Sequence, residues 1–192
     1  DLAESNKAID AATLNLLQAD LFKIDKDLQA LNVVPAQTPH VSLARYGSFY
    51  DTTDQTAAAI NTAYAMTFNT TAESMGVYVG SPTSRIYADR PALYNIQFSA
   101  QVINTSGGAH SIWIWLRKNG SDVADSATKM RLQGNNTEAV AAWNFFVRLN
   151  AGDYFELMWE VDDVAVSLWA DPASAVHPAI PSIILTVSDN IT

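Results

Sequence analysis

Polar and apolar side chains alternate strictly along several stretches of this chain, and this period of two limits its fold more than any other feature. From Tyr94 to Val102 every second residue is apolar, and the residues between them are Asn, Gln or Ser. The alternation returns at Trp143, Phe145, Val147 and Leu149, and again at Phe155, Leu157, Trp159 and Val161. Because successive side chains of a β-strand point to opposite faces, each stretch is predicted to be a strand with one buried and one solvated face.

Further short strands are expected between turn-forming residues. They cover residues 44–50, 63–68, 76–79, 85–88, 111–118, 127–132, 164–169 and 182–187. Turns at Asn119-Gly120 and at residues 106–108, 134–136 and 150–153 separate several of them. Many short strands at nearly even spacing indicate a mainly β protein with an antiparallel jelly-roll β-sandwich.

The N-terminal region has a different period. It contains no Gly or Pro before Pro35, and aliphatic residues recur at alternating intervals of three and four: Leu14, Leu17, Leu21, Ile24, Leu28 and Leu31. This heptad spacing predicts a short α-helix that self-associates as a coiled coil. The alternative is an amphipathic helix packed on its own head domain or docked on another protein. A contact between Asp20 and Asp25 of neighbouring helices would oppose a parallel coil.

Pro35 and Pro39 end any helix and favour an extended backbone between the two regions. The chain is therefore expected to comprise an N-terminal helix over residues 1–34, which acts as a stalk or anchor, and a linker over residues 35–43. A jelly-roll head domain over residues 44–192 completes the prediction.

One predicted strand is apolar on both faces. Its sequence, Ile-Trp-Ile-Trp-Leu from Ile112 to Leu116, places Trp113 and Trp115 on the face opposite the core residues. Two exposed tryptophans in one patch are typical of an interface, so these residues are candidates for an intersubunit face. The alternative is that a long loop or the N-terminal helix covers them.

A long polar loop follows the strand that ends at Trp169. Trp169, Asp171 and His177 make this loop a candidate ligand-binding site, because an exposed tryptophan beside polar residues can stack on the flat face of a sugar. The competing interpretation is that Trp169 closes one end of the sandwich.

The charge of the chain argues against several partners. Its formal net charge is −9 and no cluster of Lys or Arg is present, so binding to nucleic acid is not expected. No stretch approaches the about 20 apolar residues that span a bilayer, and membrane insertion is not expected either.

The sequence offers little support for an enzyme. His40, His110 and His177 lie far apart, and the Gly-x-Ser-x-Gly motif of a nucleophile elbow is missing. Glu156 and Glu160 share the outward phase of one strand, where a solvated sheet face is the expected environment.

Acidic residues could supply oxygen ligands for Ca²⁺ at two places. These are the pair Asp122 and Asp125 and the run Glu160, Asp162 and Asp163. Neither has the spacing of a known calcium loop, so solvated turns are favoured. We expect no catalytic residues, no metal and no cofactor.

Two segments resemble a known superfamily. Residues 93–98, Leu-Tyr-Asn-Ile-Gln-Phe, resemble the aromatic strand motif of the complement-component and tumour-necrosis-factor-like trimeric jelly rolls, and residues 149–157 resemble its Leu-x-x-Gly-Asp signature. Residues 46–51, 115–120, 141–145 and 180–187 are similar to a subset common among tailed-phage virion structural proteins. The chain departs from the family at Ala92, where the family has Gly, and it lacks the Phe-Ser-Gly-Phe run that closes the animal branch.

The resemblance covers about residues 44–188 and implies a homotrimer at the surface of an extracellular virion. The implied function is that of a non-enzymatic virion structural protein, a head fibre, decoration protein or short fibre. Its N-terminal helix would attach it to other capsid or tail proteins. The alternative is an adhesin head that binds a host surface receptor or glycan through its loop tips.

Overall fold

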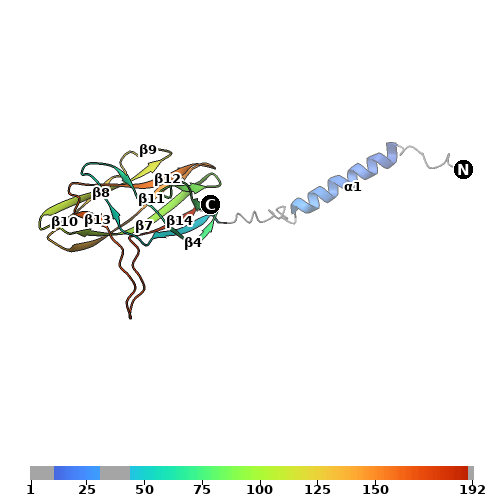
Figure 1. Cartoon of the computed structure of the whole chain (residues 1–192). Coiled ribbons are helices and arrows are strands. Elements are labelled where there is room, and N and C mark those ends of the chain that lie inside the picture. Colours follow the sequence, from blue (N-terminus) through green and yellow to red (C-terminus); the bar gives the residue numbers. More distant parts are fainter. Residues whose placement is uncertain (1–10, 31–43, 190–192) are drawn as a thin grey trace. The chain divides into compact units, whose positions relative to one another are not determined.

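The structure is a computed structural model that describes residues 11–30 and 44–189. The chain divides into two compact units, Asp1–Ser42 and Leu43–Thr192. The first contains the helix, and the second contains all the strands that the structure describes (Figure 1). The expectation of a mainly β protein with one N-terminal helix is confirmed.

The N-terminal helix, α1, extends from Ala11 to Ala30. Three residues of its apolar seam are exposed on the helix, since the exposed fractions of Leu17, Leu21 and Ile24 are 54%, 69% and 55%. Leu14 and Leu28 also lie within α1. Leu31 and the linker predicted at residues 35–43 lie outside the described residues.

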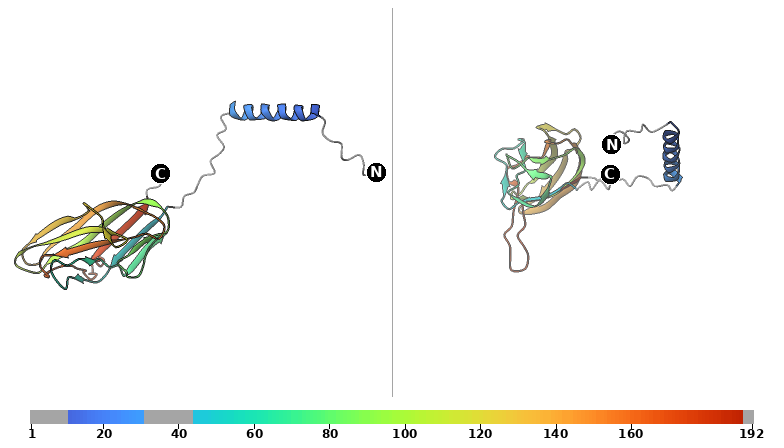
Figure 2. Two further views of the ribbon diagram at one scale, coloured as in Figure 1. Left: turned by 90° about the horizontal axis from the view of Figure 1, so that it is seen from above. Right: turned by 90° about the vertical axis from the view of Figure 1, so that its right-hand side faces the viewer.

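The head is built from two sheets, which we call sheet I and sheet II, and all strand pairs in both are antiparallel (Figures 1 and 2). The strand order of sheet I is β2 (Gln55–Thr56), β13 (Val166–Leu168), β7 (Ala92–Asn104), β14 (Ile183–Asp189), β1 (Tyr46–Asp51) and β4 (Thr70–Met75), with β11 (Thr137–Leu149) also paired to β7. The strand order of sheet II is β10 (Thr128–Gln133), β8 (Ala109–Lys118), β12 (Tyr154–Val161), β6 (Ile86–Ala88) and β5 (Val77–Val79). Two short strands complete sheet II, β3 (Tyr64–Ala65) on β12 and β9 (Ser121–Asp122) on β8.

The inner faces of the two sheets form one hydrophobic core. The apolar phase predicted for β7 is buried, with Tyr94, Ile96, Ala100 and Val102 all 0% exposed. Aromatic rings then link neighbouring strands, as where Phe98 of β7 meets Trp143 of β11 edge-on at 4.7 Å between ring centroids. Alternation along each strand therefore decides which side chains enter the core.

The stretch predicted as a strand at residues 63–68 is only partly one. Tyr64 and Ala65 pair with β12, whereas Met66 and Phe68 lie beyond the end of the strand and are still buried. The apolar character of Met66 and Phe68 therefore indicates that they are buried and does not indicate that they pair in a strand. Strand β4 was not predicted, because Thr70–Met75 is a largely exposed sheet-edge segment without apolar alternation.

The prediction that Glu156 lies on a solvated sheet face is wrong. Glu156 is 7% exposed, and its neighbour in the same phase, Met158, is 2% exposed. Arg117 and Trp115 of β8 lie directly beside them in the register, and Ser84 hydrogen-bonds to Glu156. Long side chains on the adjacent strand thus cover part of this outer face.

Candidate functional site

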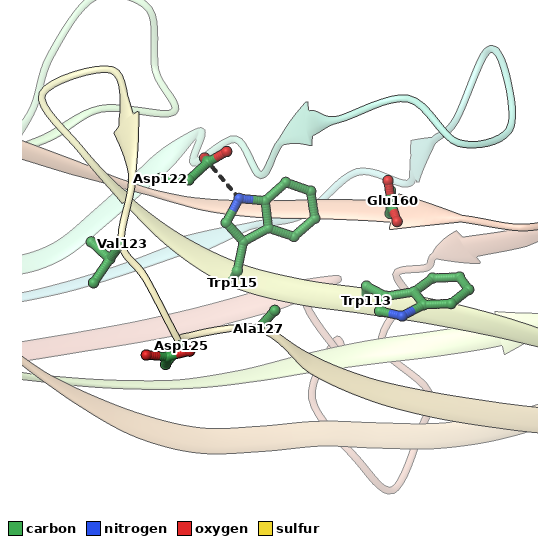
Figure 3. Close-up of a pocket in the computed structure, with 7 residues that line it drawn as sticks. All are labelled: Trp113, Trp115, Asp122, Val123, Asp125, Ala127 and Glu160. Atoms are coloured by element: carbon green, nitrogen blue, oxygen red, sulfur yellow. Dashed lines mark hydrogen bonds between the residues drawn. The ribbon is translucent and has the colours of Figure 1, made fainter.

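The outer face of sheet II contains a hollow between β8 and the loop that follows it. Ile112, Ile114 and Leu116 of β8 point into the core, and the intervening Trp113 and Trp115 are half-buried on the outer face. The hollow has a volume of about 310 Å³ and is lined by both tryptophans, Val123 and Ala127. Three carboxylates, Asp122, Asp125 and Glu160, complete the lining (Figure 3). We call this site the tryptophan groove.

The Trp115 ring is held in place by the loop. Its indole Nε1 donates a hydrogen bond to Asp122 Oδ1 at 2.8 Å, as Figure 3 shows, and Arg117 Nε donates to the same oxygen at 2.7 Å. The hydrogen bond from Arg117, and then that from Trp115, lowers the pKa of Asp122. Asp122 is therefore a charged acceptor that orients the indole.

The loop itself is pinned to β8. Asn119 and Gly120 adopt positive φ values of 48° and 82°, which form the tight turn that the Asn-Gly pair predicts. Ser126 Oγ donates to the Val123 carbonyl at 2.7 Å and accepts from the Leu116 amide at 3.1 Å. The wall of the groove is thus a hydrogen-bonded loop, which favours a preformed site.

Trp113 lies between two charged neighbours of opposite sign. Lys129 of β10 and Glu160 of β12 are its register partners on either side. The Lys129 ammonium lies 4.6 Å from the centroid of the Trp113 ring, within the range of a cation–π interaction. The row Lys129, Trp113 and Glu160 therefore crosses three strands of sheet II.

Other parts of the chain partly bury the outer apolar face of β8, which carries Trp113 and Trp115. The loop after β8 contacts Trp115, and Lys129 contacts Trp113, but both rings remain partly exposed. The intersubunit role expected for Trp113 and Trp115 stays a prediction.

The loop between β13 and β14 extends away from the sandwich as a long arm (Figures 1 and 2). Trp169 is half-buried near its base, Asp171 pairs with Ile180 in an isolated bridge, and His177 is exposed near the tip. A hollow of about 400 Å³ at the base is lined by Asp171 together with Thr52 and Asp54. Of the three predicted ligand-loop residues, Asp171 alone lines this hollow, so the structure does not bring the three together in it.

The outer face of sheet I differs in its chemistry from that of sheet II. On four of its strands the outward positions are every second residue, from Tyr46 to Tyr50 of β1, from Ile184 to Ser188 of β14, from Asn95 to Gln101 of β7 and from Val140 to Phe146 of β11. Glu73 of the edge strand β4 borders this set at Ser48, and none of the side chains within the set is charged. We call this surface the neutral face.

The neutral face is continuous across four strands. In one row Ser48, Thr186, Gln97 and Asn144 are register partners, strand after strand. Apolar side chains are exposed among these polar ones, with Val140 and Phe146 both 55% exposed. This surface was not predicted from the sequence, although the outward positions from Asn95 to Gln101 and from Val140 to Phe146 are visibly free of charged residues there.

Two of the acidic residues considered for Ca²⁺ have a different partner. Asp162 Oδ1 lies 3.7 Å from His110 Nδ1, and Asp163 Oδ2 lies 3.6 Å from His110 Nε2. His110 belongs to β8 rather than to a loop, so strand pairing brings it to the turn after β12. Among the described residues, no group of three or more His, Asp or Glu side chains is arranged to hold a metal ion.

The chain was compared with known proteins. No protein-family model matches it, and no curated protein is significantly similar to it. Across residues 11–30 and 44–189, no helix combines the length and apolar character needed to cross a membrane.

Proposed function

We propose that this chain is a non-enzymatic structural protein of a tailed-phage virion that forms a homotrimer at the particle surface. The β-sandwich is its outward head, and the N-terminal helix attaches it to other capsid or tail proteins. The order of the virion-type motifs along residues 44–188 supports the class of protein. The properties of two surfaces support the assembly.

The neutral face is the observation that carries the self-association. Each copy has a formal net charge of −9, so copies repel one another at most orientations. On the neutral face the charged outward residues of β1, β7, β11 and β14 are confined to Glu138 and Arg148, at the two ends of β11. Copies that meet through this face bring together uncharged side chains and exposed apolar groups such as Phe146, which is the composition of an interface centre.

The helix supports an attachment role. Leu17, Leu21 and Ile24 are more than half exposed in α1, and burying them against a partner is favourable. A coil of fewer than three heptads is only marginally stable by itself. Docking of the helix on another virion protein would add the apolar contact that a short trimeric coil lacks.

Light scattering on the purified chain of residues 1–192 tests the assembly. A trimer has three times the chain mass of 20.9 kDa, and a mass near 20.9 kDa at micromolar concentration would rule it out. The virion role is tested by adding the labelled chain to phage particles that lack the native protein. Saturable binding to these particles supports it, whereas binding to host cells alone would favour the adhesin alternative.

A further inference from the structure

We propose that the tryptophan groove binds a neutral saccharide. The inference is compatible with a trimer that forms through the neutral face, because the groove is on the outer face of sheet II and the neutral face is on the outer face of sheet I. It is an alternative to the intersubunit role predicted for Trp113 and Trp115, which line the groove. It also differs from the ligand loop predicted from the sequence, since Trp169, Asp171 and His177 do not line the groove.

The two tryptophans offer apolar surfaces for stacking. Trp113 and Trp115 are two residues apart on one face of β8, which places their backbone positions about 7 Å apart. Both are half-buried, so each ring is anchored in the sheet and still accessible. A pyranose ring has an apolar face of C–H groups that can lie against an indole, while its hydroxyl groups remain available for hydrogen bonds.

Two carboxylates in the groove are free to accept those hydrogen bonds. The side-chain carboxylates of Asp125 and Glu160 make no hydrogen bond or ion pair with any residue that the structure describes. Figure 3 shows the loop residues on one side of Trp115 and Glu160 on the other. Asp122 is already engaged by Arg117 and Trp115, so it positions the ring and leaves hydroxyl recognition to the other two carboxylates.

The charge balance of the groove selects a neutral ligand. Three carboxylates line it, and they would repel a phosphate, a sulfate or an acidic sugar. A cationic ligand would meet Lys129 at the Trp113 ring and Arg117 beside Trp115. A purely apolar ligand would leave the carboxylates desolvated without hydrogen bonds. A neutral polyhydroxylated ring satisfies both the indoles and the carboxylates.

The size of the groove fits a short saccharide. Its volume of about 310 Å³ is near the lower end of small-ligand pockets, and partly exposed tryptophans line it, so it is open to solvent. An open site of this kind suits one or two sugar units at the end of a longer glycan, whose remainder stays in solvent.

Two measurements on the chain of residues 1–192 test the proposal. The first is binding to an array of neutral and charged glycans. The second is a nuclear magnetic resonance titration with methyl glucoside, methyl galactoside, methyl mannoside and N-acetylglucosamine, which follows the indole N–H signals. We expect binding to at least one neutral sugar, with shifts confined to the signals of Trp113 and Trp115. Tetramethylammonium and inorganic phosphate serve as the charged probes.

Matched variants locate the site. Trp115→Ala and Glu160→Gln should each weaken saccharide binding at least tenfold, and Trp115→Phe should retain more binding than Trp115→Ala because it keeps an aromatic face. Trp169→Ala removes a half-buried tryptophan outside the groove and should bind as the parent chain does. Circular dichroism confirms that each variant is folded before it is compared.

Several results would overturn the proposal. These are a folded parent chain that binds no neutral sugar in either measurement, or binding that survives Trp115→Ala in a folded variant. Loss of binding in Trp169→Ala but not in Trp115→Ala would move the site to the ligand loop. Response to tetramethylammonium or phosphate without response to any sugar would assign the groove to a charged ligand.

Discussion

Ser84 donates a hydrogen bond to the buried carboxylate of Glu156 at 2.7 Å, and the two residues are 72 positions apart in the sequence. Glu156 is 7% exposed, and the Arg85 guanidinium Nε lies 3.8 Å from the same oxygen, Oε1. The contact joins the segment before β6 to the middle of β12. It shows how a charged residue in an outward strand position becomes part of the folded interior.

We expect Ser84→Ala to destabilise the head by about 1–3 kcal/mol, because it removes a hydrogen bond from a buried charge. Urea unfolding followed by tryptophan fluorescence measures the change. Ser74→Ala, at an exposed position of the edge strand β4, is the control and should alter the free energy of unfolding by no more than about 0.5 kcal/mol. Equal stability of the two variants would mean that the Ser84 hydrogen bond contributes nothing.

Two isoleucines test which face of the sandwich is the core. Ile96 is 0% exposed in β7, and Ile60 is 48% exposed in the loop before β3. We expect Ile96→Ala to cost about 2–5 kcal/mol and Ile60→Ala to have little effect, because only the first creates a cavity. A thermal melt of both variants gives the comparison. A larger loss for Ile60→Ala would contradict the strand register.

Asp153 should make the stability of the head depend on acidity. Hydrogen bonds from the Asn150 amide and the Asn119 side chain, together with Lys118, lower its pKa from 3.8 to about 2. A carboxylate whose pKa is lower in the folded state stabilises the fold above pH 3.8, and that contribution is lost as the pH falls toward about 2. We therefore expect Asp153→Asn to lower the melting temperature at neutral pH.

The difference between Asp153→Asn and the parent chain should shrink through the same acidic range. A difference in melting temperature that stays constant from neutral pH to pH near 2 would show that Asp153 acts through its shape and not its charge.

A charge on the neutral face should disrupt self-association. We expect Phe146→Asp to shift the mass measured by light scattering toward the single-chain value of 20.9 kDa, because each contact between copies would bury the new carboxylate. Val176→Asp is the control, since Val176 is 92% exposed on the arm between β13 and β14. An unchanged mass for Phe146→Asp, with a native circular dichroism spectrum, would exclude this face as the interface.

Removal of the N-terminal region should leave the head folded. The hydrophobic core cluster consists of residues between Phe49 and Val187, and it contains none from α1. We expect a chain that begins at Thr38 to remain rich in β-structure and to unfold cooperatively, yet to lose binding to phage particles that lack the native protein. Collapse of the sandwich would contradict the independence of the head, and retained binding would place the attachment surface on the head.

The fold class and most of the strands follow from the sequence because they depend on local patterns. Burial of one face of a strand requires an apolar residue at every second position, and β7, β11 and β12 all carry that pattern. The helix follows in the same way, from a period of three and four without Gly or Pro. Each of these patterns lies within a short segment, so it can be recognised without knowing which distant residues the segment contacts.

The surfaces were decided by the tertiary structure. Nothing near Glu156 in the sequence shows that Ser84 and Arg117 will lie beside it. Likewise, the sequence around Trp115 does not show whether its ring packs against a loop or remains fully exposed. The neutral face likewise requires the strand order β1, β14, β7 and β11, which joins segments more than 100 residues apart in the chain. The alternation of a strand predicts that a residue faces outward. Which side chains it contacts there depends on sheet pairing and loop packing, because those contacts form between residues distant in sequence.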